Sequence, residues 1–171
     1  RTYVELMSKT FGTHHTYYMS DSSDKLAQSL AKAMHAKDLP GMADVESSLM
    51  LFCKKVKEKY KVALSGECAD EIFGGYPWFH SEEAFKTDGF PWMKYKNERN
   101  SLLSDSLTSY IKPQEYIKQR YFESIEETPR LETDSKEEAR RREIQYLNMN
   151  WFMQTLLDRK DRMSMSCGLE V

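Results

Sequence analysis

Residues 61–66 constrain the fold more than any other part of the chain. They read Lys-Val-Ala-Leu-Ser-Gly, so a short continuous apolar run leads directly into a Ser-Gly pair. Such a run is typical of a strand that helices cover on both faces of a sheet. Apolar residues at helical spacing come before it and turn residues come after it. This order predicts an α/β fold in which helices dominate.

Hydrophobic periodicity assigns most of the remaining chain to helices. In the segment that begins at Asp44, the apolar positions expected to face the core are Val45, Leu49, Phe52, Val56 and Tyr60. The helices are expected around residues 4–11, 26–34, 44–60, 101–110, 113–126 and 135–163.

Strand candidates are few. Residues 13–19 are rich in β-branched and aromatic side chains and predict a second strand, and residues 169–171 look like the start of a third. A buried strand needs neighbours on both edges, and the chain supplies few of them. Because the sequence also starts at Arg1 rather than at Met, we expect an internal segment of a longer protein.

Charge and composition exclude some classes of function. The chain has 25 Lys and Arg against 27 Asp and Glu in 171 residues, a net charge of -2, which argues against a nucleic-acid-binding protein. The run Arg140-Arg141-Arg142 is offset by nearby glutamates and is expected to be a solvated helix face. No apolar run approaches the ~20 residues of a membrane span. Three cysteines without C-x-x-C spacing favour neither disulfides nor zinc, and a reducing cytoplasm fits them best.

The stretch Ser65 to Tyr76 holds three of the seven glycines and a group of acidic residues. Glu67, Asp70 and Glu71 have the spacing i, i+3 and i+4, which would place them on one face of the first helical turns. Carboxylates so placed suit Mg²⁺ with phosphates, together with a general base. Gly74-Gly75 is expected to end the short helix.

The same residues also allow a structural interpretation. Acidic residues in the first turn of a helix are ordinary partners of its dipole, and the chain contains neither G-x-x-x-x-G-K-[ST] nor G-x-G-x-x-G. A non-catalytic helical interaction module therefore stands as an alternative to an enzyme. In either case, the aromatic residues between Trp78 and Tyr95 are expected to pack in a core or an interface.

Two motifs carry a family resemblance. S-G-E-C-A-D-E-I-F-G-G-Y, residues 65–76, closely resembles the S-G-E-G-[AS]-D-E-x-F-G-G-Y signature of the synthetase domain of glutamine-hydrolysing asparagine synthetases. D-R-M-S-M-S-C-G-L-E, residues 161–170, resembles their D-[RK]-x-S-M-x-x-G-[LV]-E segment. The resemblance implies part of a parallel-sheet domain of the adenine nucleotide alpha hydrolase-like type. It also implies a ligase of asparagine biosynthesis; lactam-forming relatives of the same fold are a second alternative.

The resemblance implies a role for each matching residue. Such enzymes use ATP and Mg²⁺ to convert aspartate into β-aspartyl-AMP, which ammonia from glutamine then attacks. Ser65 and Gly66 would contact ATP, Asp70 would help to hold Mg²⁺, and Glu67 would be the catalytic base. Glu71 and Arg159 would lie at the same pocket. The partners are then small molecules, with no nucleic acid or membrane, and a homo-oligomer stays open.

The sequence departs from the family pattern in two respects. The family's S-G-G-x-D-S phosphate loop is absent, so residues 1–171 are expected to be a single partial synthetase domain. The amino-terminal glutaminase domain, the phosphate loop and the carboxyl-terminal end would lie outside it, and the isolated chain should be inactive. Cys68 stands where the family more often has Gly; we expect an ordinary helical φ there and a packing role rather than a nucleophile.

Overall fold

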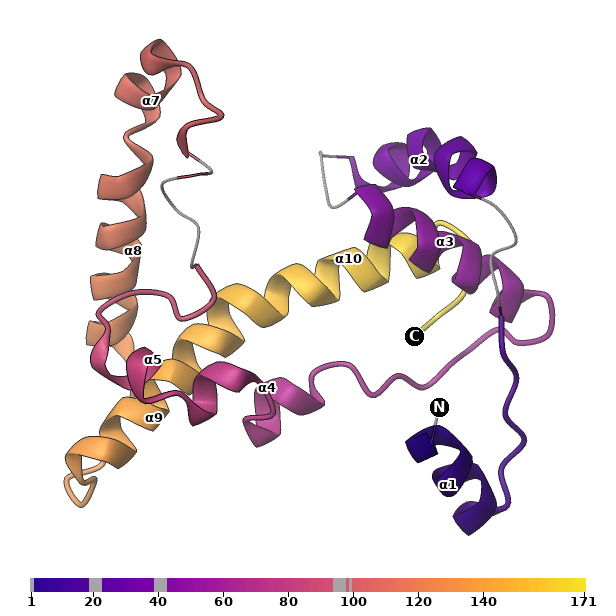
Figure 1. Ribbon diagram of the computed structural model, residues 1–171, viewed down its shortest axis with the longest axis horizontal. Helices are drawn as coiled ribbons and strands as arrows, with labels where there is room; N and C mark the ends of the chain where they lie inside the picture. The colour runs from indigo at the N-terminus through magenta and orange to yellow at the C-terminus, as the bar shows by residue number, and fades with distance from the viewer. Residues whose placement is uncertain (1, 19–22, 39–42, 94–97, 99) are drawn as a thin grey trace. The chain divides into compact units, whose positions relative to one another are not determined.

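The computed structural model describes residues 2–18, 23–38, 43–93, 98 and 100–171. The described residues are mostly helical, which confirms the helix-dominated part of the predicted fold class (Figure 1). They divide into two compact units, here called the terminal unit (residues 1–64 and 159–171) and the central unit (residues 65–158). None of the described helices is long and apolar enough to cross a bilayer.

The terminal unit is built on two helices that lie side by side, α2 (Ser23–Lys37) and α3 (Ala43–Lys57). Its core contains Ala33 of α2, Met50 of α3 and Met163 of α10 (Met153–Met165). These three side chains are at most 3% exposed. The first helix of the chain, α1 (Thr2–Phe11), buries none of its residues. The bounds of α1, α2 and α3 match the helices predicted at residues 4–11, 26–34 and 44–60.

The buried face of α3 differs from the predicted one. The side chains that α3 buries include Ser47, Met50 and Cys53, whereas Phe52 is 50% exposed and Tyr60, beyond the end of the helix, is 61% exposed. The residues that α2 buries are Ser29, Ala33 and Lys37, and Ala33 shares a core cluster with Met50 of α3. Of the predicted apolar stripe, Leu49 packs against the core, and it also lines a cavity with Val45 and Phe52, which is described with the functional site.

The strand predictions have a mixed outcome. Val62 and Glu170 form an isolated parallel β-bridge, in which Ala63 N–H donates to Glu170 O (2.8 Å) and Glu170 N–H to Lys61 O (3.0 Å). This bridge pairs the first predicted strand residues with the segment predicted to start a third strand. However, Leu64 is fully exposed, contrary to the expectation of a strand buried on both faces. Residues 13–18 form no strand, and Met19 lies outside the described residues.

The central unit begins with short elements and continues with longer helices. Its core contains Phe90, Tyr121 and Leu147, which agrees with the packing role expected for the aromatic segment; Tyr95 of that segment lies outside the described residues. The elements are α4 (Ala69–Phe73), the 3₁₀ helix η1 (Pro77–His80), α5 (Glu82–Lys86), α7 (Asp105–Ile111), α8 (Pro113–Glu127), α9 (Lys136–Leu147) and the π-helix η2 (Asn148–Phe152), which leads into α10.

The predicted helix 135–163 corresponds to α9, η2 and α10, which follow one another without a break (Figure 1). Ser135 caps the amino end of α9 in a capping box with Glu138, because each side chain binds the other residue's backbone N–H. Gly168, with φ of +72°, follows the last turn of α10, as expected of a glycine that ends a helix. The five-residue π-helix in the middle was not predicted.

Arg140 is not part of a solvated face, as the sequence had suggested. Its side chain is only 13% exposed, and all five of its N–H donors are used. They reach three carbonyl oxygens around the end of α5, the Tyr121 hydroxyl and the Glu143 carboxylate. A planar guanidinium can satisfy so many acceptors at once, and Arg140 thereby joins α5 to α8 and α9.

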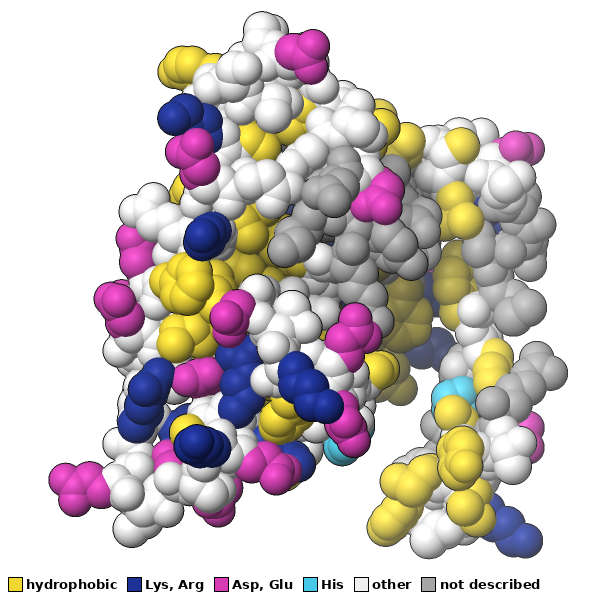
Figure 2. Space-filling model, turned by 60° about the vertical axis from the view of Figure 1, so that its left-hand side comes forward, with side chains coloured by type: hydrophobic (Ala, Val, Ile, Leu, Met, Phe, Trp, Pro, Cys, Tyr) yellow, Lys and Arg dark blue, Asp and Glu magenta, His cyan; other side chains and the backbone are white. Residues whose placement is uncertain are grey.

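The neighbouring arginines do behave as predicted. Arg141 pairs with Glu137 at 2.8 Å and Arg142 with Asp134 at 3.0 Å. Figure 2 shows Lys and Arg side chains interspersed with Asp and Glu on one face of the molecule. Opposite charges that are interspersed in this way can pair locally.

Replacing Arg140 should loosen the junction that it holds. In Arg140→Leu, the carbonyls at the end of α5 lose their buried donor, which costs on the order of 3 kcal/mol. Hydrogen exchange of the α5 amides, measured in the full-length protein, should then accelerate about a hundredfold if they exchange by opening of this junction. Arg142→Leu is the matched control on the same helix, because its ion pair with Asp134 holds no group of α5. Equal exchange rates in the two variants would contradict the assignment.

Candidate active site

The signature stretch begins with two linked turns. The Ser65 hydroxyl accepts a hydrogen bond from the backbone N–H of Glu67 at 3.1 Å. The carbonyl of Gly66 accepts one from the N–H of Ala69 at 3.3 Å, which closes a four-residue turn over residues 66–69. Glu67 is therefore held at a turn position immediately before α4, and not on the helix as its spacing had predicted.

Cys68 occupies the position of this turn that favours glycine. Its φ of 76° and ψ of -2° are those of the third residue of a type II turn, where a positive φ is required. The expectation of an ordinary helical φ at Cys68 is therefore wrong. Glycine, which the family signature has at this position, adopts such a φ without strain. A residue with a side chain costs roughly 1–2 kcal/mol of strain here.

The two glycines after α4 meet different needs. Gly74 ends the helix with φ of 68°, as predicted for a carboxyl-terminal glycine. Gly75 leaves space for the side chain of Asp70. A Cβ atom on residue 75 would clash with Oδ1 of Asp70 and lie 3.0 Å from its carboxyl carbon. The carboxylate of Asp70, in the first turn of α4, thus lies directly against the backbone of Gly75.

Glu71 is placed apart from the other two acidic residues. Glu67 is partly exposed and Asp70 is exposed, whereas Glu71 is 0% exposed. The expectation of three carboxylates on one helix face is therefore wrong. Among the described residues, no group of three or more His, Cys, Asp and Glu side chains could hold a metal ion.

Tyr76 holds the buried carboxylate. Its hydroxyl donates to Oε1 of Glu71 at 2.6 Å, and Gln145 of α9 donates from its side-chain amide to the backbone carbonyl of Glu71. Burial raises the pKa of Tyr76 above its ordinary value of 10.0, and the hydrogen bond to Glu71 raises it further. The negative charges of Glu71, Asp70 and Glu67 add to this increase in pKa, so all three acids lie within electrostatic range of this hydroxyl.

The ring of Tyr76 connects the signature to the aromatic core. It stacks on Trp78, with ring centroids 4.4 Å apart, and meets the edge of Phe152 at 5.2 Å. The sequence signature contains Tyr76, but spacing alone did not assign it a function. Gln145 carried no sequence signal, because its partner is 74 residues away along the chain.

Arg159, the remaining predicted pocket residue, belongs to the terminal unit. There it lines a cavity of about 390 Å³, together with Tyr18 and residues of α2 and α3. Those helix residues include Val45, Leu49 and Phe52 of the predicted apolar stripe. The side chain of Arg159 therefore faces apolar surface within its own unit.

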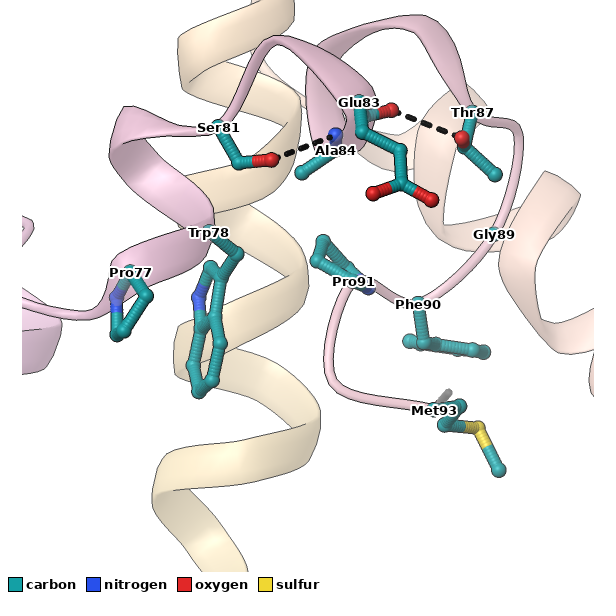
Figure 3. A pocket seen from close by; sticks show the side chains of 10 residues that line it. All are labelled: Pro77, Trp78, Ser81, Glu83, Ala84, Thr87, Gly89, Phe90, Pro91 and Met93. Atoms are coloured by element: carbon teal, nitrogen blue, oxygen red, sulfur yellow. Dashed lines mark hydrogen bonds between the residues drawn. The ribbon is translucent and has the colours of Figure 1, made fainter. Parts of the chain in front are cut away.

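A second cavity, of about 480 Å³, begins directly after the signature (Figure 3). Trp78, Phe90, Pro91 and Met93 give it mainly apolar walls, and Glu83 is the one ionisable residue among the ten that line it. The hydroxyl groups of its walls are used locally: Ser81 accepts from Ala84 N–H, and Thr87 donates to the Glu83 carbonyl. A wall with one carboxylate and no basic residue does not suit phosphate groups.

Replacing Cys68 tests the turn geometry. Cys68→Gly should stabilise the protein by about 0.5–1 kcal/mol, because the relief of strain exceeds the extra chain entropy that glycine loses on folding. Cys68→Ala is the control, since alanine keeps the Cβ atom and the strain. Thermal unfolding of the full-length proteins should give a higher Tm for the glycine variant alone. An equal rise in the alanine variant would show that the thiol, and not φ, is unfavourable.

Tyr76 should make stability depend on alkaline pH. Because its folded-state pKa is raised, folding binds the phenolic proton more tightly, so this stabilisation is complete below pH 10 and declines as the pH rises further. Tyr76→Phe loses the hydrogen bond to Glu71 and should be less stable at neutral pH by about 1–3 kcal/mol. The difference between the two proteins should narrow above pH 10 when unfolding is followed by circular dichroism. A constant difference up to pH 11 would contradict this coupling.

Comparison with known proteins agrees with the signature. The family model for asparagine synthase matches residues 1–171. A protein of Bacillus subtilis (strain 168), named asparagine synthetase (glutamine-hydrolyzing) 3, is 50% identical over 169 residues. The matched region covers 99% of this chain and 27% of the length of the Bacillus protein. The chain belongs to the asparagine synthase family.

Proposed function

We propose that the full-length protein makes asparagine from aspartate in an ATP-dependent ligase reaction, with ammonia supplied by hydrolysis of glutamine. The observation that carries this proposal is the 50% identity to a protein named glutamine-hydrolyzing asparagine synthetase, which extends over nearly the whole chain. The chain would contribute one wall of the synthetase site. A cytoplasmic enzyme acting on small molecules is consistent with the described helices and the mixed surface charge.

Ser65 and Gly66 are proposed to contact ATP. In the structure, the Ser65 hydroxyl shapes the turn by accepting the Glu67 N–H, and both residues are exposed. A Cβ atom on Gly66 would meet nothing within 4 Å, and its φ is not positive. Among the described residues, neither packing nor backbone conformation therefore requires a glycine at this position. Close approach of a nucleotide to the backbone would supply such a requirement.

Asp70 is proposed to help hold Mg²⁺. Its carboxylate is exposed and lies in the first turn of α4, while Glu71 is buried and cannot reach a shared ion. Mg²⁺ in nucleotide sites is usually bound by one or two carboxylates and the substrate phosphates, so the residues present fit this ion. Bound there, the ion would neutralise phosphate charge as the aspartate carboxylate attacks ATP and pyrophosphate leaves.

Glu67 is proposed as the catalytic base. Attack of ammonia on β-aspartyl-AMP gives a tetrahedral intermediate whose positively charged nitrogen must lose a proton before or while AMP leaves, and a carboxylate within reach can accept that proton. The turn over residues 66–69 fixes the backbone of Glu67, and its side chain keeps partial exposure. Glu67 thus combines a defined position with access to a substrate, which the buried Glu71 lacks.

Replacing Glu67 separates the two half-reactions. In the full-length protein, Glu67→Gln should lower the rate of asparagine formation by about 10²–10⁴, the usual contribution of a general base. ATP–pyrophosphate exchange in the presence of aspartate should persist, because it requires no proton transfer from ammonia. Glu82→Gln, at an exposed residue paired with Lys86, is the matched control and should leave both rates unchanged.

Three outcomes would count against the assignments. Normal asparagine formation by Glu67→Gln would remove Glu67 as the base. Loss of the exchange reaction as well would place Glu67 in substrate activation. Absence of any aspartate-dependent exchange in the wild-type protein would contradict the ligase itself and favour the non-catalytic alternative or a lactam-forming activity on another carboxylate.

A further inference from the structure

Two fully buried polar side chains of the central unit have atoms whose hydrogen bonds are not satisfied. Glu71 and Asn148 are both 0% exposed. Oε2 of Glu71, and both Oδ1 and Nδ2 of Asn148, have no hydrogen-bond partner among the residues that the structure describes. A buried polar group without a partner costs about 1–3 kcal/mol, so native proteins rarely leave such groups unsatisfied.

Contacts on either side of Asn148 show that it faces the same surroundings as Glu71. One turn before it, Gln145 donates to the backbone carbonyl of Glu71. One turn after it, the ring of Phe152 meets the ring of Tyr76, whose hydroxyl binds Oε1 of Glu71. Residues three to four apart share a helix face. Asn148 therefore lies between two side chains that both contact the Glu71–Tyr76 pair.

The π-helix strengthens this placement. Asn148 is the first residue of η2, and the wider turn up to Phe152 holds residues 148 and 152 closer to one face than an α-helical turn would. Single π-turns interrupt α-helices at a cost and are frequent where a side chain must be aimed at a particular site. Within this turn Asn148 is fully buried, while the side chain of Asn150 donates to the Tyr146 carbonyl of its own helix.

We propose that one ordered water molecule bridges Oε2 of Glu71 and the side-chain amide of Asn148. A water molecule can donate to the carboxylate oxygen and, through its remaining hydrogen or lone pair, bind Oδ1 or Nδ2 of the amide. Buried waters typically make about three such hydrogen bonds to otherwise unsatisfied groups. The bridge would tie the signature stretch to η2, and it does not depend on the reaction proposed above.

A high-resolution crystal structure of the full-length protein tests the bridge directly. We expect a single peak of density about 2.6–3.2 Å from both Oε2 of Glu71 and one amide atom of Asn148. Three observations would overturn the proposal: no peak, a direct bond between the two side chains, or a peak with the shorter contacts of a coordinated metal cation, about 2.0–2.6 Å. None of these outcomes depends on whether the protein makes asparagine.

A double-mutant cycle tests the bridge in solution. If Glu71→Gln and Asn148→Leu disrupt one shared bridge, their Tm losses should be non-additive, with a smaller loss in the double variant than the sum of the single losses. Asn150→Leu is the matched control in the same π-helix, and its loss should add to that of Glu71→Gln. Additive losses for the Glu71 and Asn148 variants would overturn the proposal. Should Asn148→Leu fail to fold, the crystal structure of the wild-type protein still decides.

Discussion

The carboxylate of Glu71 has no exposed surface, and a chain can bury such a group only if it supplies hydrogen bonds to its oxygens. Tyr76 supplies one of them from five residues further on. To return over so short a distance, the chain must end α4 at once and turn back, which Gly74 allows through its positive φ. The hydrogen bond between Glu71 and Tyr76 thus fixes the path of the second half of the signature, and the rings stacked against Tyr76 fix that path to the core.

Burial divides the acidic residues of the signature into two kinds. Glu71 lies inside the unit, where loss of the hydrogen bond from Tyr76 would leave a buried carboxylate without that partner. Glu67 and Asp70 keep access to solvent, yet both contribute to the raised pKa of Tyr76, so they lie around the same hydroxyl. This division agrees with the proposed roles, in which Asp70 would face a cation and Glu67 would accept a proton.

Local patterns in the sequence predicted the local features of the fold. Hydrophobic periodicity located most of the helices, and Gly74 marked the end of α4, because both depend on neighbours within a few residues. The inward face of α3, the buried Arg140 and the buried Glu71 depend on partners tens of residues away, and no spacing rule contains them. One apolar run predicted a buried strand and the family resemblance implied a parallel sheet, but the described residues of that run form a single bridge with Glu170.

Cys68 shows why even a local prediction can fail at a functional site. Cysteine is not a residue type that favours a positive φ. The sequence around Cys68 therefore predicts a helical φ. The turn is instead closed by backbone groups, from Gly66 to Ala69, and its third residue lies in the left-handed region although that residue is a cysteine. Strain at one residue is tolerated when the surrounding contacts determine the turn more strongly than the residue's own preference. Because those contacts also position the backbone of Glu67, we expect the exchange of glycine for cysteine to change the stability of the turn more than its geometry.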